Sequence, residues 1–323
     1  MRMGIGHFFR TLFFVYLFAM VGQSASAEET GYPIIDKSQP GVSRPDTYVP
    51  LAKAMQPWRL CVLLPRLEDQ YVQSVNYGLV EEARRLGIRM QIFEAGGYDS
   101  LQAQRKQMVD CANDGAQATI VSPLVHDGLS DILEDMKVRN IPVLTLLGDT
   151  SLGPVAARIT APAYEGAYQL AQYLVKRHLG EKRSIRVAWF PGPQLASWAV
   201  AADKGFREGL KDSNLSIEMS EFGNFNLSTP TQLIGDVLGN DEGFEYVVGQ
   251  GINTRAVATM LRQRYLEYRT RIAAYYVNED IIKGIFRGTV LAAPYHGEMI
   301  LGRIAVNQAV RLLEKQKIRG CPR

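Results

Sequence analysis

The stretch WRLCVLLPRLEDQYVQSVNYGLVEEARRLGIRMQIFEAGGY, residues 58–98, determines the fold class. It opens with the apolar run Leu60–Leu64, which is short enough to be a strand buried on both faces. Apolar residues then recur at helical spacing as far as Gly87, and Ile88–Phe93 predicts a second strand. A strand, a crossover helix and a second strand form a right-handed βαβ unit, so we expect these two strands to be parallel.

Two loops of this unit lie where ligands usually bind. Ligands of open parallel sheets bind outside the carboxyl ends of the strands. The loop that ends in Tyr71 and the loop Ala95–Tyr98 each follow a predicted strand, so both are expected at that edge of the sheet.

The alternation of strands and helices continues and predicts two α/β lobes. Four strands with helices between them are expected from residue 58 to residue 147, and a second alternating set follows. Its expected strands are 185–190, 215–219, 246–248, 272–277 and 289–292, with a helix at 229–238 among the connections. A long amphipathic helix, Glu298–Glu314, closes the pattern. The expected fold is therefore two doubly wound parallel-sheet lobes around a ligand cleft.

Residues 1–27 have the features of a secretory signal peptide. Two arginines and no acidic residue precede or flank the apolar run Thr11–Gly22, and Ala25–Ala27 is a small-residue cleavage site, so cleavage is expected before Glu28. The apolar run is too short to span a bilayer stably, although a retained membrane anchor is the alternative. Residues 28–57 hold five prolines and are expected to form a tether or a surface arm rather than a domain.

Charge and motif content exclude several function classes. Cleavage takes away two of the 36 Lys and Arg residues and none of the 33 acidic residues, so the formal net charge falls from +3 to +1. A near-neutral protein without a basic face is not expected to bind nucleic acid. The sequence contains no HExxH, GxSxG or Cys/His metal spacing, so no enzyme activity, metal or cofactor is expected.

Two of the three cysteines are candidates for a disulfide. Cys61 lies in the first predicted strand, and Cys111 lies late in the predicted helix 101–112, which should pack on the same sheet. An oxidising compartment permits a Cys61–Cys111 bridge. Two buried free thiols are the alternative.

Several blocks of this sequence resemble the type I periplasmic binding proteins. The resemblance extends from Trp58 to Gln316 and is carried by residues 58–87, EAGGY at 94–98, QMVDCANDGAQATIV at 107–121 and WFPGP at 189–193. Within that family the chain is most similar to the branch that senses trimethylamine N-oxide (TMAO). The resemblance implies lobe one from residues 58–160 and 295–318 and lobe two from residues 161–294. The family pattern continues beyond this point, so a chain that stops at Arg323 is expected to have a shortened C-terminus.

The resemblance also implies a function. It implies a periplasmic, non-catalytic protein that binds TMAO or a related methylated amine and docks on the periplasmic domain of a membrane sensor histidine kinase. The alternative is a periplasmic sugar-binding receptor of an ABC transporter. Polar residues at strand-end loops would then hold sugar hydroxyls, and the candidates are Asp69, Asn253, Asn278 and His296.

A TMAO site needs aromatic faces and hydrogen-bond donors. Each aromatic face around the methylated, electron-poor nitrogen contributes about 0.5–2 kcal/mol, and the oxide only accepts hydrogen bonds, which a tyrosine hydroxyl can donate. The predicted strand-end loops supply Tyr71, Tyr98, Tyr164, Trp198 and Tyr276. The resemblance matches Tyr71 and Tyr98 to aromatic positions of the lobe-one site and Tyr276 to one of lobe two. For each ring, an ordinary place in the core is the alternative.

Two positions depart from the pattern of the TMAO-sensing branch. Val72 and Ala163 stand where that branch is expected to have tryptophan, and Trp198 stands where it has small residues. Either Trp198 refills the space and the aromatic cage is rebuilt, or the ligand is larger than TMAO.

Overall fold

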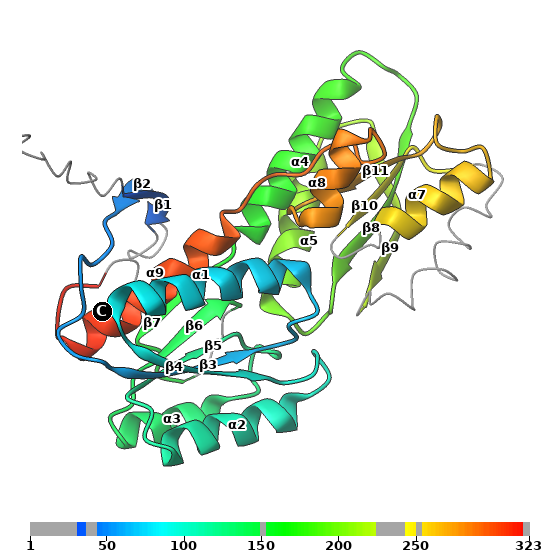
Figure 1. Cartoon of the computed structure of the whole chain (residues 1–323). Coiled ribbons are helices and arrows are strands. Elements are labelled where there is room, and N and C mark those ends of the chain that lie inside the picture. The colour runs from blue at the N-terminus through cyan, green and yellow to red at the C-terminus, as the bar shows by residue number, and fades with distance from the viewer. Residues whose placement is uncertain (1–30, 37–43, 149–152, 224–242, 250–253, 319–323) are drawn as a thin grey trace, which may run out of the picture. The chain divides into compact units, whose positions relative to one another are not determined.

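The computed structural model of the chain describes residues 31–36, 44–148, 153–223, 243–249 and 254–318 (Figure 1). The predicted signal peptide, the predicted helix at 229–238 and the chain end after residue 318 lie outside these ranges. None of the helices within them combines the length and the apolar character needed to cross a bilayer.

The first lobe is built on five parallel strands in the order β4-β3-β5-β6-β7. The strands are β3 (Arg59–Leu64), β4 (Arg89–Glu94), β5 (Ala118–Val121), β6 (Val143–Leu147) and β7 (Ala157–Thr160). Its helices are α1 (Gln70–Leu86), α2 (Leu101–Asn113), α3 (Ser130–Val138) and α9 (Glu298–Leu313). Helices α1 and α9 cover one face of the sheet, and α2 and α3 cover the other (Figure 1).

Strand β3 shows why this lobe has two cores. Its side chains alternate between the faces of the sheet, so Leu60, Val62 and Leu64 pack under α1 and α9. Cys61 and Leu63 point to the opposite face and pack with α2 and α3. There Cys61 meets Cys111 of α2, and the two form a disulfide with their Cα atoms 6.0 Å apart. An uninterrupted apolar run is what a parallel strand covered on both faces requires.

Helices α1 and α9 approach each other closely because each has a glycine at the contact. A Cβ atom at Gly78 would lie 2.0 Å from the carbonyl oxygen of Met299, and one at Gly302 would lie 2.2 Å from that of Val75. Both distances are far below van der Waals contact, so any side chain at either position would push the helices apart. This contact fixes the last helix of the chain against the first helix of the lobe.

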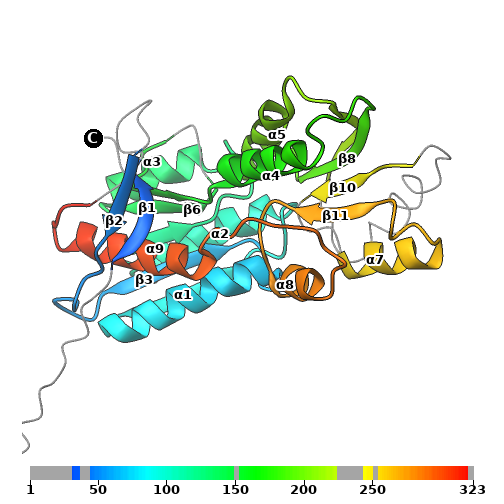
Figure 2. The same cartoon turned by 90° about the horizontal axis from the view of Figure 1, so that it is seen from above.

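The second lobe is built on four parallel strands in the order β11-β10-β8-β9. The strands are β8 (Ile185–Gly192), β9 (Leu215–Phe222), β10 (Tyr246–Gly249) and β11 (Arg271–Ala274). Its helices are α4 (Ala163–Arg177), α5 (Ser197–Leu210), α7 (Thr254–Gln263) and α8 (Glu279–Phe286), with α4 and α5 on one side of the sheet and α7 and α8 on the other (Figure 2). The predicted strand at 289–292 is reduced to a single bridge between Val290 and Ile272.

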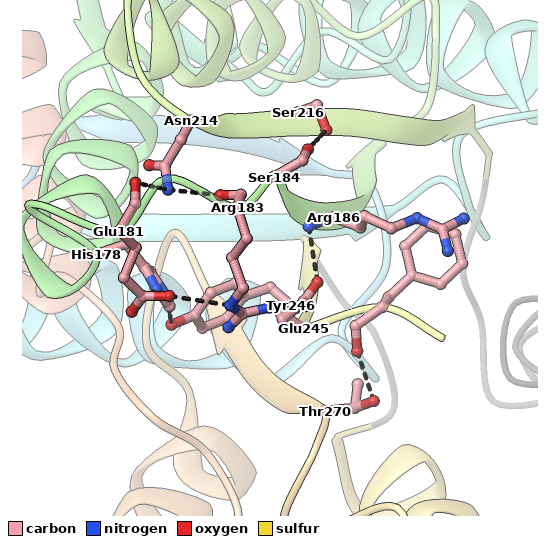
Figure 3. A network of polar contacts seen from close by, with 11 residues as sticks. His178, Glu181, Arg183, Ser184, Arg186, Asn214, Ser216, Glu245, Tyr246 and Thr270 are labelled. Atoms are coloured by element: carbon pink, nitrogen blue, oxygen red, sulfur yellow. Dashed lines mark hydrogen bonds and ion pairs between the residues drawn. The ribbon is translucent and has the colours of Figure 1, made fainter. Parts of the chain in front are cut away.

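A polar network joins the amino ends of the strands of the second lobe (Figure 3). The ring of His178 lies between the Glu181 carboxylate at 2.8 Å and the Tyr246 hydroxyl at 2.7 Å. Arg183 pairs with Glu245 at 2.5 Å. These groups lie at the edge of the sheet opposite to the carboxyl ends of its strands, so we assign them to the stability of the lobe.

The proline-rich segment before the first lobe contains a strand pair that the sequence did not predict. Strands β1 (Tyr32–Asp36) and β2 (Arg44–Tyr48) are antiparallel. Tyr48 and Leu51 are buried in the first-lobe core, and the backbone N–H of Leu51 donates to Asn307 of α9 at 2.6 Å. The segment is therefore held against α9 by apolar burial and by hydrogen bonds.

Candidate ligand-binding site

A small cavity lies between the two lobes at the carboxyl ends of their strands. The residues that line it come from the last residue of β6, from the segments after β3, β4, β7, β8 and β11, and from the segment before α9. They are Asp69, Tyr71, Val72, Tyr98, Leu147, Ala161, Ala163, Trp198, Tyr275, Tyr276 and His296. This is where the topology of open parallel sheets places a ligand.

The cavity is small. The centre of a water-sized sphere can occupy about 40 Å³ of it. A single water needs roughly 10–15 Å³ on this measure. The cavity therefore has room for about three waters.

Two aromatic pairs close the cavity, and each pair has one ring from each lobe. Tyr71 of α1 meets Tyr276 edge-on, with ring centres 5.1 Å apart. Tyr98 meets Trp198 of α5 in the same way at 5.8 Å. The Trp198 ring fits because residue 192 is glycine, since a Cβ atom there would lie 2.7 Å from the indole. Edge-to-face pairs of this kind contribute about 0.5–1.5 kcal/mol beyond their burial.

Asp69 places a carboxylate in the cavity wall and also starts helix α1. Its Oδ1 accepts a hydrogen bond from the backbone N–H of Tyr71 at 2.8 Å, which is the geometry of a helix N-cap. Burial raises the pKa of this carboxyl, while the backbone N–H groups and the nearby charge of Arg66 act in the opposite direction. Burial disfavours the charged form, so a cationic group in the cavity would restore a favourable partner for it.

Two buried polar atoms of the cavity wall lack a hydrogen-bond partner within the described part of the chain. They are the hydroxyl of Tyr71 and Nε2 of His296. The Tyr275 hydroxyl, by contrast, donates to the carbonyl oxygen of Pro191 at 2.5 Å. Burial lowers the pKa of His296 to about 4, with the charge of Glu165 opposing, so the imidazole is neutral at pH 7. Burial raises the pKa of Tyr71 well above its ordinary value, and the charge of Glu298 adds to the effect.

A pair of side-chain hydrogen bonds joins the lobes beside the cavity. The amide nitrogen of Gln70, at the start of α1, donates to Asp280 Oδ2 at 3.3 Å. The backbone N–H of Asp280 in turn donates to the amide oxygen of Gln70 at 3.2 Å. The first turns of α1 and α8 therefore lie next to each other (Figure 2).

The structure brings five of the six predicted site residues together. Asp69, Tyr71, Tyr98, Trp198 and Tyr276 line the cavity. Tyr164 does not line it. The residue before it, Ala163, lines the cavity, and successive residues of a helix point about 100° apart. Tyr164 therefore points away, stacks on Tyr168 and donates to Glu208 at 2.5 Å.

Of the polar residues proposed for a sugar site, some line the cavity and others do not. His296 lines the cavity, whereas Asn278 caps α8 by accepting a hydrogen bond from the backbone N–H of Ile281 at 2.8 Å, and Asn253 lies outside the described residues. Tyr275 was missed. It is the first of two tyrosines that directly follow β11, and that position was the available signal.

The lining of the cavity is mainly aromatic. Its residues include no serine, cysteine or lysine that could act as a nucleophile. Within the described ranges no group of three or more His, Cys, Asp or Glu side chains could hold a metal ion. The lining supplies aromatic faces, the carboxylate of Asp69, the neutral imidazole of His296 and four tyrosine hydroxyls, of which that of Tyr71 is buried without a partner in the described structure.

Comparison with known proteins identifies the family. Residues 60–317 match the family described as the periplasmic binding protein domain. The periplasmic protein TorT of Escherichia coli strain K12 is 30% identical over 266 residues, which cover 82% of this chain and 76% of TorT.

Several solved structures share the fold of this chain. An ABC transporter solute binding protein from Bradyrhizobium sp. BTAi1 with bound bis-tris is 34% identical with a TM-score of 0.78, covering 93% of this chain and 91% of that one. TorT in its complex with the TorS sensor domain in the presence of TMAO is 25% identical with a TM-score of 0.74, covering 82% and 89%. Sugar-binding proteins at lower identity share the fold, among them the Caulobacter myo-inositol binding protein at 17% identity and a TM-score of 0.75.

These matches confirm the resemblance to type I periplasmic binding proteins and to TorT. The observed parallel sheets and their helices agree with the predicted fold class. The chain therefore belongs to the periplasmic binding protein family, and TorT is among its relatives.

Proposed function

We propose that this protein is a periplasmic sensor that binds a small methylated amine in the cavity between its lobes, with TMAO as the leading ligand. The observation that carries the proposal is the composition of that cavity, which combines aromatic faces from both lobes with a buried carboxylate and an unpartnered tyrosine hydroxyl. The likeness to TorT supports the choice of ligand.

The chemistry of TMAO suits this lining. Its methyl groups carry the positive character of the nitrogen and would face the rings of Tyr98, Trp198 and Tyr276, at about 0.5–2 kcal/mol for each well-placed ring. Asp69 would supply the negative charge that a desolvated cation needs. The oxide would accept a hydrogen bond from the Tyr71 hydroxyl, which lacks a partner in the described structure.

The composition of the lining favours a methylated amine over a sugar. Most of the residues that line the cavity present aromatic or aliphatic side chains. A sugar would also need a partner for each hydroxyl group, because a buried polar group without one costs about 1–3 kcal/mol. Among the lining residues, only the Tyr71 hydroxyl and His296 Nε2 are buried side-chain atoms without a hydrogen-bond partner in the described part of the chain, which is fewer groups than a sugar would need.

The aromatic pairs suggest how a bound ligand would be reported. A ligand that touches Tyr71 and Tyr98 of one lobe and Tyr276 and Trp198 of the other binds the closed arrangement more tightly than an open one. A partner that recognises the closed surface then responds to ligand. The partner we propose is the periplasmic domain of a TorS-like sensor histidine kinase, since TorT forms a complex with the TorS sensor domain. Catalysis is not part of the proposal.

A second candidate is a transport receptor of an ABC transporter. The observation in its favour is the likeness to the Bradyrhizobium solute binding protein, which has bis-tris bound. Such a receptor would use the same cavity for a different amine and would dock on a membrane permease.

Thermal unfolding of the mature chain with single ligands tests the proposal. The ligands are TMAO, trimethylamine, betaine, choline and ribose. A ligand at one hundred times its Kd adds about 2.7 kcal/mol to the free energy of unfolding, so TMAO should raise the unfolding midpoint. Stabilisation by ribose and by none of the amines would refute the proposal. Titration of the isolated kinase sensor domain, with and without TMAO, then separates a sensor from a transport receptor.

A further inference from the structure

We propose that Gln70 and Asp280 form a latch between the two lobes, and that this latch sets how tightly the cavity holds any ligand that needs the closed arrangement. Neither residue lines the cavity, so both are positioning residues that act through closure and not through contact with the ligand. The inference rests on the proposed function and adds to it a control of affinity that does not depend on the identity of the ligand.

The two residues are bonded to each other in both directions. Nε2 of Gln70 donates to Asp280 Oδ2 at 3.3 Å, and Oε1 of Gln70 accepts from the backbone N–H of Asp280 at 3.2 Å. A glutamine side chain can do both because its amide carries a donor and an acceptor. Both bonds are long for N–H···O hydrogen bonds, and the side chains are only partly buried. We therefore expect the latch to make a modest contribution to closure.

The location of both residues at helix starts explains why they pair. Gln70 is the first residue of α1, and Asp280 is the second residue of α8. The first N–H groups of a helix have no acceptor within the helix. In α8 the Asn278 cap accepts from the N–H of Ile281, and the N–H of Asp280 donates to Gln70 of the other lobe. Separation of the lobes breaks this bond, so the latch exists only in the closed arrangement.

The latch lies directly beside residues that line the cavity. Gln70 stands between Asp69 and Tyr71 in the chain, and Tyr71 meets Tyr276 of the other lobe with ring centres 5.1 Å apart. A bond between residues 70 and 280 therefore favours the same approach of the lobes as this aromatic pair. The apparent affinity of a ligand that needs the closed arrangement is reduced by the fraction of the protein that is closed. Loss of the latch lowers that fraction, so it should weaken every such ligand by the same factor.

A second contact between the lobes limits the effect of losing the latch. The backbone N–H of His126, after β5 of the first lobe, donates to the carbonyl oxygen of Leu195, after β8 of the second, at 3.3 Å. Strand β10 lies between β8 and β11, so this contact is at a different place along the sheet edge from the latch. It uses no side-chain atom and persists in latch variants. Closure should therefore be weakened by such variants but not abolished.

The test exchanges the two polar groups of the latch. Gln70→Glu removes the side-chain donor and places a second carboxylate against Asp280, so it should weaken closure. Asp280→Asn keeps an acceptor for Gln70 and should change little. In the double variant Gln70→Glu/Asp280→Asn, the carboxylate at position 70 can accept from the side-chain amide and from the backbone N–H of position 280, so closure should recover. A disturbance of the neighbouring lining residues by Gln70→Glu would not be repaired by a change in α8.

Two measurements report closure. In small-angle X-ray scattering without ligand, Gln70→Glu should have a larger radius of gyration than the wild type, and the double variant should return to the wild-type value. In calorimetric titrations, Gln70→Glu should weaken TMAO and tetramethylammonium by the same factor of about 3 to 10, which corresponds to about 0.7–1.4 kcal/mol. The double variant should recover most of both affinities.

Gln73→Glu is the matched control, because Gln73 lies on the same helix, is exposed and does not line the cavity. It makes the same change of charge and should match the wild type in both measurements. An unchanged radius of gyration in Gln70→Glu would overturn the inference. Unequal losses for the two ligands, or losses that the double variant does not restore, would overturn it too. A wild-type protein that binds neither ligand would refute the proposed function, and the scattering alone would then decide whether the latch exists.

Discussion

Replacing Tyr71 by phenylalanine should move stability and ligand affinity in opposite directions. The Tyr71 ring packs edge-on against Tyr276 and His296, at 5.1 and 6.4 Å between ring centres. Its hydroxyl is buried and has no partner in the described part of the chain. Phenylalanine keeps the ring contacts and removes only the hydroxyl.

The two effects can be estimated separately. A buried polar group without a partner costs about 1–3 kcal/mol, so Tyr71→Phe should raise the free energy of unfolding of the ligand-free protein by about 1 kcal/mol. For a protein of this size that corresponds to about 2–4 °C in the unfolding midpoint. The same change removes a hydrogen bond to the polarised oxide of TMAO, which is worth about 1.5–3 kcal/mol. TMAO affinity should therefore fall by a factor of about 10 to 150.

The assay is thermal unfolding without ligand together with calorimetric titration of TMAO. Tyr275→Phe is the matched control, because Tyr275 lies in the same cavity wall but its hydroxyl already donates to the Pro191 carbonyl oxygen. That control should lower the free energy of unfolding by about 1 kcal/mol, since it leaves a buried carbonyl without its partner. A Tyr71→Phe protein that is less stable than wild type without ligand and binds TMAO with unchanged affinity would show that the reasoning is wrong.

Three further changes test other parts of the site. Trp198→Ala removes one aromatic face and should weaken TMAO binding by about 0.5–2 kcal/mol in a calorimetric titration, with the fold retained in circular dichroism. Asp69→Asn keeps an N-cap for α1 but removes the charge, so tetramethylammonium affinity should fall, and should fall most at low ionic strength. Between pH 6.5 and 4 the folded state binds fewer protons at His296 than the unfolded chain does, because the folded-state pKa is about 4. The free energy of unfolding should therefore decrease as the pH falls through this range, and His296→Phe should flatten the curve.

Much of the fold was predictable because local pattern and tertiary burial agree. Every residue of Leu60–Leu64 is buried between two helix layers, as an uninterrupted apolar run predicts. The strand pair β1–β2 was not predictable from local pattern. Tyr48 at the end of β2 and Leu51 just after it are buried in the first-lobe core, and this tertiary contact holds the pair in place. Pro33 and Pro45 lie within the pair, and proline disfavours strands in a sequence-based prediction.

The sequence predicted a strand at 289–292, but the structure has only a single bridge there. The reason lies in hydrogen bonds that the local sequence pattern does not show. The backbone N–H groups of Thr289 and Val290 both donate to the carbonyl oxygen of Gly284 at the end of α8, at 2.9 and 3.1 Å. The pairing with β11 consists of the Leu291 N–H, which donates to the carbonyl oxygen of Ile272 at 2.7 Å, and the carbonyl oxygen of Ala292, which accepts from the Ala274 N–H at 3.1 Å. The end of the helix therefore takes the donors that a longer strand would need.

The site was predictable to the extent that it follows from strand ends. Tyr71 and Tyr98 lie after β3 and β4 of the first sheet, and Tyr276 lies after β11 of the second, so position alone placed each at the carboxyl edge of its sheet, where the cavity lies. Tyr164 points away from the cavity because of its angular position on helix α4. That angular position cannot be predicted from where the preceding strand ends. Nor could the sequence show that the Tyr71 hydroxyl and His296 Nε2 would each be buried without a partner in the described structure, because that depends on how segments far apart in the chain pack.

The position of Trp198 links the composition of the cavity to its closure. Val72 and Ala163 line the cavity with small side chains where the TMAO-sensing branch is expected to have tryptophan, and the indole in this protein comes from α5 of the second lobe. There it meets Tyr98 of the first lobe. A cage whose rings all came from one lobe could hold a ligand in an open protein, and such a ligand would shift no equilibrium. A cage completed by a ring from the other lobe is complete only when the lobes are together, so the difference between the affinities of the ligand for the closed and open forms is the free energy that the proposed signalling could use.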